Sequence, residues 1–399
     1  RVVQKLRAYS ECDWDNNWAD YSDFDLNEET AKVLTQILED DLEDKFDDEN
    51  DELMCWVPAH AWRIISQKKY EKGLPALVDR LSFGDDDDFA HMDLTKAISN
   101  FGPRAIPYLK KCLREETIHG PDIWGVVYVL DVFGKIAEGW AEQKPIIAET
   151  LRESLSEFEV NPPALNSFLI THLVDLRDGE ALPLIQKVFA RKFLDETIID
   201  WNGIRRDMAK LDELPEYIEV EKYNPNESYY SGDVLFQKLL KSIGSPFNIE
   251  ELKCYVLGSV LAIDMVQPLT VVEDVMTDLD SSELEFETEG QAFYFYREFF
   301  GLWNQLAGYQ DKLFELPMID VQDLSDLDER SRWSVISTRT QWCLMSFLDG
   351  LKAGDTEGDR LGDGDAAEFL LWLEERIEAL ESVVEDSRKL DVSVTKSLI

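Results

Sequence analysis

The residues best suited to bind a metal ion form a glycine-rich acidic stretch, residues 354–365. Calcium is held by oxygen ligands from glycine-containing loops, and the residue at position twelve of an EF-hand loop is a bidentate glutamate. Counted from Asp355, the twelfth residue is Ala366, and Leu361 occupies position seven. The stretch therefore favours an acidic loop that ends in an Asp365 N-cap, and residues 84–88 predict the same kind of turn and cap. We predict no metal site.

Cysteine and histidine, the usual zinc ligands, are few and scattered along the chain. The cysteines show no CxxC or CxC spacing, and they are Cys12, Cys55, Cys112, Cys254 and Cys343. The histidines are equally scattered, at His60, His91, His119 and His172. An odd, scattered set of cysteines in a long chain is typical of reduced thiols. We therefore expect no zinc and no cofactor. The cytoplasm, or another reducing compartment if a presequence has been removed, is the expected location.

Catalytic signatures are also absent from the sequence, which has no GxSxG, HExxH or P-loop pattern. Glu138, Glu142 and Glu149 are candidate carboxylates, but 82 of the 399 residues are acidic. Pairs of carboxylates carry no information in such a composition. We predict no catalytic residue and a protein that is not an enzyme.

The net charge is strongly negative. Acidic residues outnumber Lys and Arg by 82 to 40, which gives a formal charge of −42. A protein of this charge is repelled by phosphate backbones and by anionic lipids. The sequence also has no run of about 20 apolar residues, the length that spans a bilayer. We expect neither direct nucleic-acid binding nor membrane insertion.

Basic residues are scarce and cluster near the ends of two expected helices. Cations at a helix C-terminus are stabilised by the helix dipole, which explains most of them. The alternative is a positive strip that binds an acidic peptide. For that strip the candidate partner-binding residues are Lys110, Arg114, Lys187 and Arg191.

An aromatic-rich helix is expected over residues 291–309, with rings on more than one face. A helix that is apolar all round is buried in a core or covered by a partner. We expect the core of a C-terminal domain, and the alternative is a protein interface. Phe299 and Trp303 are the candidate contact residues for that interface.

One local pattern returns four times between residues 74 and 185. A proline opens an apolar, helix-period segment at Pro75, Pro107, Pro145 and Pro183, at separations of 32, 38 and 38 residues. Proline suits the first turn of a helix because its missing N–H would have no partner there. Spacing on this scale predicts stacked pairs of helices, since each pair alone leaves an apolar face uncovered.

With its Gly-Pro and Leu-Pro turns, the segment 58–201 resembles the HEAT-repeat family, in the short form found in bacterial phycobilin-lyase-like proteins. The resemblance implies an α-solenoid. It says little about function, because the repeat is a generic scaffold.

A second resemblance lies in the C-terminal half. Residues 250–258 and 342–351 resemble the two signature helices of the YecA-like family. Cys254 and Ser346 stand where that family has glycines. The resemblance implies a compact all-α protein-binding domain and no reaction.

Residues 1–57 are expected to be an acidic leader. Trp14 and Trp18 are spaced as on one helical face, Asn27 is expected to cap a helix, and residues 39–52 form an acidic block. The predicted architecture is all-α. Its divisions are a leader at 1–57, a HEAT-like α-solenoid at 58–213, a connector at 214–233, a YecA-like helical domain at 234–386 and a tail at 387–399.

The function expected from this architecture is a non-catalytic scaffold, meaning an adaptor, assembly factor or regulator that holds another protein in a groove. The oligomeric state is left open. One alternative is an acidic mimic of nucleic acid that occupies a DNA- or RNA-binding protein. Another is an enzyme such as a lyase-type HEAT protein, which requires a pocket with converging polar groups.

Overall fold

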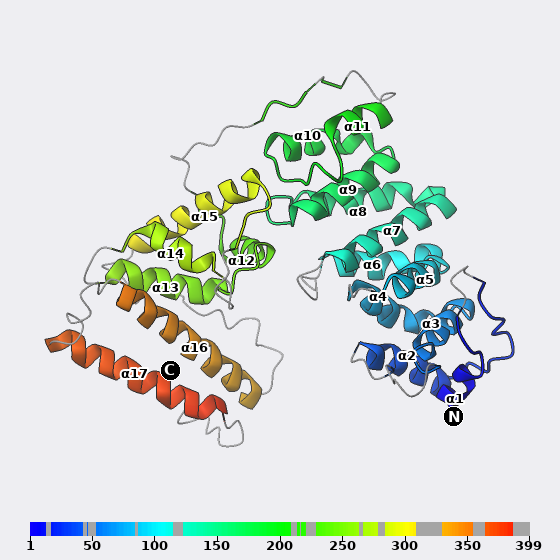
Figure 1. The fold of residues 1–399 in the computed structure, drawn as a ribbon, viewed down its shortest axis with the longest axis horizontal. Coiled ribbons are helices and arrows are strands. Elements are labelled where there is room, and N and C mark those ends of the chain that lie inside the picture. The colour runs from blue at the N-terminus through cyan, green and yellow to red at the C-terminus, as the bar shows by residue number, and fades with distance from the viewer. Residues whose placement is uncertain are drawn as a thin grey trace. The chain divides into compact units, whose positions relative to one another are not determined.

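The computed structural model of the chain describes residues 1–12, 17–42, 46, 53–83, 87–114, 123–208, 214–215, 217–220, 229–262, 266–277, 284–308, 329–353 and 364–385. Its regular elements in these ranges are all helices (Figure 1), which confirms the all-α prediction. The chain divides into two compact units, Arg1–Glu221 and Lys222–Ile399, each described here by itself. In the described parts, no helix has the length and apolar character needed to cross a bilayer.

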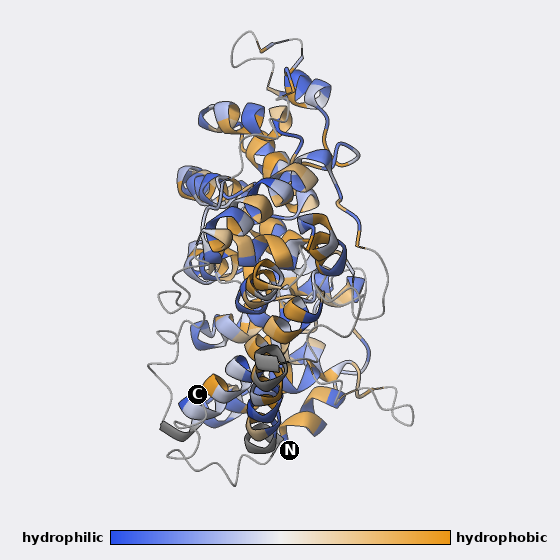
Figure 2. Ribbon diagram, turned by 90° about the vertical axis from the view of Figure 1, so that its left-hand side faces the viewer, coloured by the Kyte–Doolittle hydropathy of each residue, from blue (hydrophilic) through white to orange (hydrophobic). Residues whose placement is uncertain are grey.

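The helices of the N-terminal unit form two rows. Their bounds are α1 (Val2–Arg7), α2 (Glu28–Asp41), α3 (Val57–Gln67), α4 (Leu74–Ser82), α5 (Asp88–Ser99), α6 (Ile106–Arg114), α7 (Trp124–Gly139), α8 (Lys144–Leu155), α9 (Pro163–Asp175), α10 (Leu182–Ala190) and α11 (Trp201–Asp207). Successive odd-numbered helices touch from α1 to α11, and successive even-numbered helices touch from α2 to α8. Many helices carry both hydrophobic and hydrophilic residues (Figure 2), as expected when one face is buried against neighbours.

The repeated prolines occupy equivalent places. Each is the second residue of an even-numbered helix, and the four helices are α4, α6, α8 and α10. A short 3-10 turn precedes each of these helices, at Glu71–Gly73, Gly102–Ala105, Ala141–Gln143 and Gly179–Ala181. The prolines therefore mark the start of the second helix of each pair, as predicted.

Residues 1–57 pack into the N-terminal unit. Helix α1 contacts α3, and α2 contacts both α3 and α4. Leu6 and Leu34 are fully buried, and Asn27 caps α2 in a reciprocal capping box with Thr30. Trp18 is not helical, which corrects the expected helical face, and Trp14 lies outside the described residues. The leader is thus a layer of the stack.

A buried ion pair connects this layer to the repeats. Arg63 is only 1% exposed, and its Nε donates to Oδ2 of Asp93 at 2.6 Å. The indole N–H groups of Trp18 and Trp62 also donate to the Asp93 carboxylate, both at 2.6 Å. One carboxylate on α5 therefore holds α3 and the leader together.

His60 makes a second buried link between α3 and the leader. Its Nε2 lies 2.8 Å from the carbonyl oxygen of Ser10, and its Nδ1 lies 2.6 Å from the hydroxyl of Tyr21. A carbonyl only accepts, so Nε2 carries the proton and Nδ1 accepts from Tyr21. Burial lowers the pKa of His60, against the opposing effect of the Ser10 hydrogen bond. The neutral ring is the form that folding selects.

This lowered pKa predicts a pH dependence of stability. An unfolded histidine binds its proton near pH 6.5, whereas folded His60 resists protonation until a lower pH. The stability that His60 contributes is therefore complete above about pH 6.5, the pKa of the unfolded histidine, and falls as the pH drops below that value. Urea unfolding measures the free energy of unfolding at pH 5.5 and at pH 7.5. We expect the drop in this free energy from pH 7.5 to pH 5.5 to be about 1 kcal/mol larger in the wild type than in His60→Gln. Equal differences in the two proteins would contradict this expectation.

The C-terminal unit is built around one central helix. Its helices are α12 (Asp233–Ser242), α13 (Ile249–Leu261), α14 (Pro268–Val275), α15 (Glu289–Ala307), α16 (Glu329–Ala353) and α17 (Gly364–Glu385). Helix α13 contacts α12, α14, α15 and α16. Its N-cap is Asn248, which forms a capping box with Glu251.

Helices α13 and α16 pack in parallel over three turns. Arg339 donates to Glu250, the thiols of Cys254 and Cys343 are hydrogen-bonded, and Gly258 lies against the backbone of Phe347. Each pair is separated by 89 residues, and a constant separation arises only when two helices run in the same direction. Residues 250–258 and 342–351 are therefore direct neighbours.

The predicted connector is docked at both ends. The Trp201 indole donates to the carbonyl of Pro215 at 2.9 Å within the N-terminal unit. In the C-terminal unit, the Tyr229 amide donates to the Arg297 carbonyl, and Ser231 donates to the fully buried Glu298. The division between the units falls inside the predicted connector.

Candidate functional site

Of the two acidic stretches, only one provides the predicted helix cap, because α17 begins at Gly364 and Asp365 therefore lies inside the helix and not at its N-cap. Asp87 caps α5 through the Ala90 amide, as predicted for residues 84–88. Residues 354–363 of the calcium-like loop lie outside the described residues. Within the described ranges, no three His, Cys, Asp or Glu side chains come together in a way that could hold a metal ion.

The predicted basic strip is largely engaged within the protein. Arg114 pairs with Glu153, and Arg191 pairs with Glu159. The ammonium of Lys187 lies over the Phe158 ring, 5.3 Å from its centre. The hydrogen bond from Arg114 and the charges of Arg114 and Lys110 lower the pKa of Glu153. Three of the four cations therefore contact internal partners, and Lys110 acts on Glu153 through its charge, which favours the structural interpretation.

The aromatic helix α15 belongs to the core. Phe299 is fully buried, and Trp303 is half-buried with its ring 6.3 Å from that of Phe299. Helix α15 packs against α13. A partner cannot contact Phe299 unless the unit opens, so the core interpretation of this helix is favoured.

A cysteine–histidine pair, which sequence reasoning did not bring together, joins the leader to α3. The Cys12 sulfur is 3.8 Å from both ring nitrogens of His60. Burial raises the pKa of the Cys12 thiol to about 12. The reactive form of cysteine is the thiolate, so this thiol is a poor nucleophile near neutral pH. Its role is structural.

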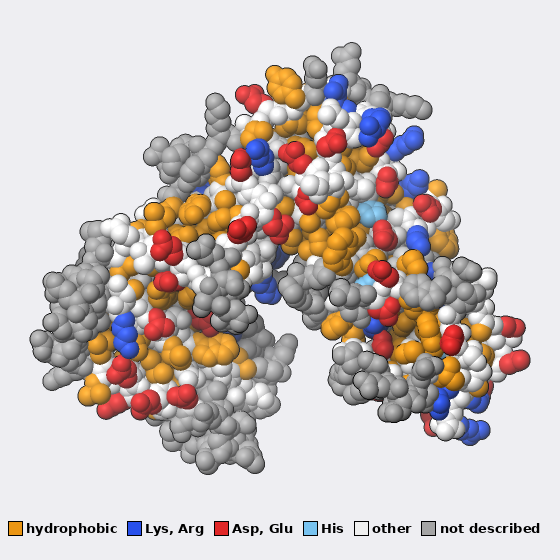
Figure 3. All heavy atoms as spheres, viewed as in Figure 1, with side chains coloured by type: hydrophobic (Ala, Val, Ile, Leu, Met, Phe, Trp, Pro, Cys, Tyr) orange, Lys and Arg blue, Asp and Glu red, His pale blue; other side chains and the backbone are white. Residues whose placement is uncertain are grey.

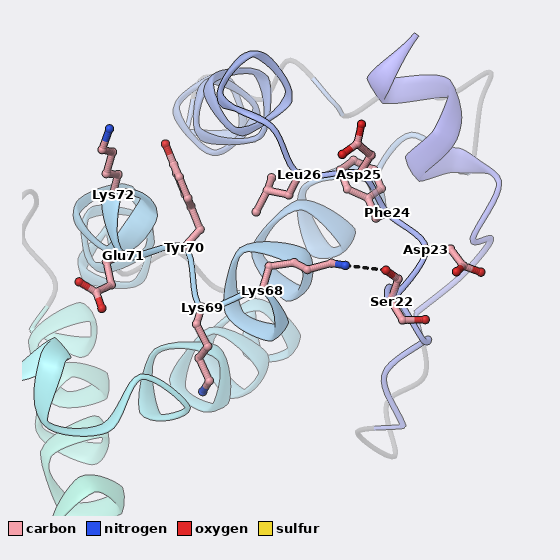
Figure 4. Close-up of a pocket in the computed structure, with 10 residues that line it drawn as sticks. All are labelled: Ser22, Asp23, Phe24, Asp25, Leu26, Lys68, Lys69, Tyr70, Glu71 and Lys72. Carbon is pink, nitrogen blue, oxygen red and sulfur yellow. Dashed lines mark hydrogen bonds between the residues drawn. The ribbon is translucent and has the colours of Figure 1, made fainter.

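An open groove of about 770 Å³ lies between residues 22–26 and the turn 68–72 (Figure 4). Lys68 reaches across it and donates to the Ser22 carbonyl at 2.6 Å. Lys69 turns away and donates to the Asn100 carbonyl. Two of the three lysines thus fasten the leader and the turn, and we assign this groove no ligand.

A second pocket lies between α7, α8 and α9. We call it the acidic pocket. Its volume is about 630 Å³, and it is lined by Asp131, Gly134, Lys135, Ala137, Glu138, Lys144, Ile147, Leu151, His172, Asp175 and Leu176. Ile147 and Leu151 of α8 are fully buried and contribute apolar surface, while the charged residues come mainly from α7 and α9.

The pocket contains a histidine beside two carboxylates. Nε2 of His172 lies 3.5 Å from Oδ1 of Asp131, and the His172 side chain is 13% exposed. Burial lowers the pKa of His172, against the opposing charges of Asp131 and Asp175. Partial burial raises the pKa of Asp131, opposed by the charges of His172 and Lys135. His172 is therefore neutral near pH 7, and its ring adds no positive charge to the pocket.

An aromatic patch adjoins this pocket. It consists of Trp124 and Tyr128 on α7 and Phe168 on α9. The Trp124 and Phe168 rings are 5.7 Å apart, and Trp124 is 47% exposed. Tyr128 stacks on His91 of α5 at 4.0 Å. Figure 3 shows hydrophobic side chains gathered in the middle of this unit, with histidine and acidic side chains beside them.

The patch and the pocket form one continuous surface. The pairs Trp124–Phe168 and Asp131–His172 both bridge α7 and α9. Asp131 follows Trp124 on α7, and His172 follows Phe168 on α9. The two helices therefore run in the same direction, side by side. On a helix, positions i, i+4 and i+7 share a face, which aligns Trp124, Tyr128 and Asp131.

The chemistry of this surface is set by the side chains that line the pocket and the patch. Neutral His172 is a proton acceptor, but the lining residues of the acidic pocket include no hydroxyl or thiol nucleophile. Exposed rings next to a pocket of mixed charge are typical of a protein-binding surface.

Sequence reasoning missed this surface because its parts lie on two separate helices. A signal was nevertheless present, since the very apolar α7 carries a stripe of non-apolar and aromatic residues at helical spacing.

Comparisons with protein-family models, with curated proteins and with solved structures found no match to this chain.

Proposed function

We propose that this chain is a non-catalytic protein-binding scaffold, and that it holds its partner along the aromatic patch and the acidic pocket. The observation that carries the proposal is the exposure of Trp124 on a surface that it shares with a pocket. Partly exposed, adjacent aromatic rings are the common anchors of protein interfaces. The stack of helix pairs supports a HEAT-like origin for residues 58–201, and the α13–α16 packing supports a YecA-like origin for the C-terminal domain.

The proposed location is the cytoplasm or another reducing compartment. The five cysteines are all unbridged, including Cys254 and Cys343, whose thiols touch. A reducing environment preserves such a pair as thiols.

The test is capture of partners by the full chain from its native cell, followed by mass spectrometry. The Trp124→Ala/Phe168→Ala variant is expected to capture about tenfold less of the partner, or less still, because interface aromatic anchors contribute about 2 kcal/mol or more to binding. Trp342→Ala is the matched control, because Trp342 is 48% exposed but lies in the C-terminal unit. Thermal melting confirms that the variants are folded.

Two outcomes would contradict the proposal. One is equal loss of the partner in the control and in the patch variant. The other is capture that vanishes with moderate salt and consists of nucleic-acid-binding proteins, which would favour mimicry of nucleic acid instead.

A further inference from the structure

The acidic pocket carries an inference about the chemistry of the partner, and this inference rests on the function proposed above. The charged side chains that face the pocket are Asp131, Lys135 and Glu138 from α7, Lys144 from α8, and Asp175 from α9. His172 is neutral near pH 7 for the reason given above. The carboxylates therefore outnumber the cations.

The helix ends add to this negative potential. Glu138 lies in the last turn of α7, and Asp175 is the last residue of α9. The C-terminus of a helix carries a partial negative charge of about half a unit from its free carbonyl groups. Helix α8 presents its N-terminus at Lys144, which offsets one of these two ends. The sum of side chains and helix ends remains negative.

The uncompensated charges are the carboxylates of Glu138 and Asp175. Neither forms an ion pair with any residue that the structure describes, in contrast to Glu153 and Glu159, which pair with arginines. The partly exposed side chain of Leu176 in the pocket lining suits the aliphatic stem of a long side chain. Lysine and arginine bury such stems while their charged ends meet carboxylates or water.

The distance between patch and pocket sets the spacing within the partner. Trp124 and Asp131 are seven residues apart on α7, which corresponds to about 10.5 Å along the helix axis. A partner helix laid along the α7–α9 surface spans that distance with two side chains at positions i and i+7.

We infer that the partner of this surface is a basic amphipathic helix. Its apolar side chain packs on the aromatic patch, and a lysine or arginine seven residues away enters the acidic pocket and pairs with Asp131 and Asp175. The net charge of −42 on the whole chain attracts such a segment from a distance.

The test is selection from a library of random 16-residue peptides displayed on phage, with the full chain immobilised. We expect the enriched peptides to share an apolar residue and a lysine or arginine seven positions apart. For one enriched peptide made synthetically, we expect Asp131→Asn/Asp175→Asn to weaken binding by about three- to tenfold. The matched control is Glu142→Gln/Glu149→Gln, which neutralises two exposed acids outside the pocket and leaves binding unchanged.

The possible results separate this inference from the proposed function. If the binding of the peptides requires Trp124 and Phe168 but not Asp131 and Asp175, the proposed scaffold function stands and the inference of a basic partner is wrong. Enriched peptides rich in acidic residues would lead to the same conclusion. Absence of any peptide that depends on Trp124 and Phe168 would overturn both. Asp175→Arg, at an exposed position, provides a second variant should Asp131→Asn disturb folding.

Discussion

Replacement of Asp93 by alanine is expected to lower the free energy of unfolding of the N-terminal unit by about 3–5 kcal/mol, the usual result of leaving a buried charge without its partner. Arg63 is 1% exposed, and its guanidinium stays protonated even when it is buried. The same substitution removes the acceptor for the indole groups of Trp18 and Trp62. Urea unfolding followed by tryptophan fluorescence measures the loss.

Two further variants show whether the isolated charge is the cause. In Arg63→Met/Asp93→Leu no charge is left at this buried site, and we expect much of the lost stability to return. Glu71→Ala breaks an exposed pair with Arg104, whose side chains are 54% and 63% exposed. That change should lower stability by less than about 1 kcal/mol. A double variant as unstable as Asp93→Ala would show that the cause lies elsewhere.

The second large effect is expected at the contact between α13 and α16. A Cβ atom on Gly258 would lie 2.2 Å from the Phe347 carbonyl oxygen, and one on Gly350 would lie 2.1 Å from the Tyr255 carbonyl oxygen. Backbone atoms cannot move aside without separating the helices. Gly258→Ala and Gly350→Ala should each lower the free energy of unfolding of the C-terminal unit by about 2 kcal/mol or more.

Hydrogen exchange identifies where this loss occurs. We expect amides of α13 and α16 to exchange faster in both variants, while amides of α7 and α9 are unchanged. Gly139→Ala is the control, because a Cβ on this helical glycine meets nothing within 4 Å. Alanine favours helix over glycine, so Gly139→Ala should be neutral or slightly stabilising. Unchanged exchange in α13 after Gly258→Ala would contradict the tight packing.

Helix starts and the repeating helix pairs could be predicted because they depend on residues close together in the chain. Asn27, Asp87 and Asn248 each accept a hydrogen bond from a backbone amide within three residues. The repeated prolines act within the first turn of their own helices. Such signals are complete in a short window of sequence, and the structure places them as expected.

The candidate site was predicted less well, because side chains of one type compete for many possible partners. For Lys187 and Arg191, stabilisation of a helix end was expected and partner binding was the alternative, and Phe158 and Glu159 of the protein itself lie beside them. In a chain with 82 acidic residues, the sequence does not say which carboxylate meets which cation. Asp131 and His172 were therefore not recognised as neighbours.

Sequence alone determined that this protein is all-helical, that a run of its helices comes in proline-marked pairs, and that its charge is strongly negative. Tertiary structure decided that the leader is a layer of the stack, that α13 and α16 run in parallel, and that α7 and α9 share a patch and a pocket. The reason is the range of the interactions. Caps and helical periodicity act over a few residues, whereas the bond from Trp18 to Asp93 spans 75 residues and exists only once the helices have packed.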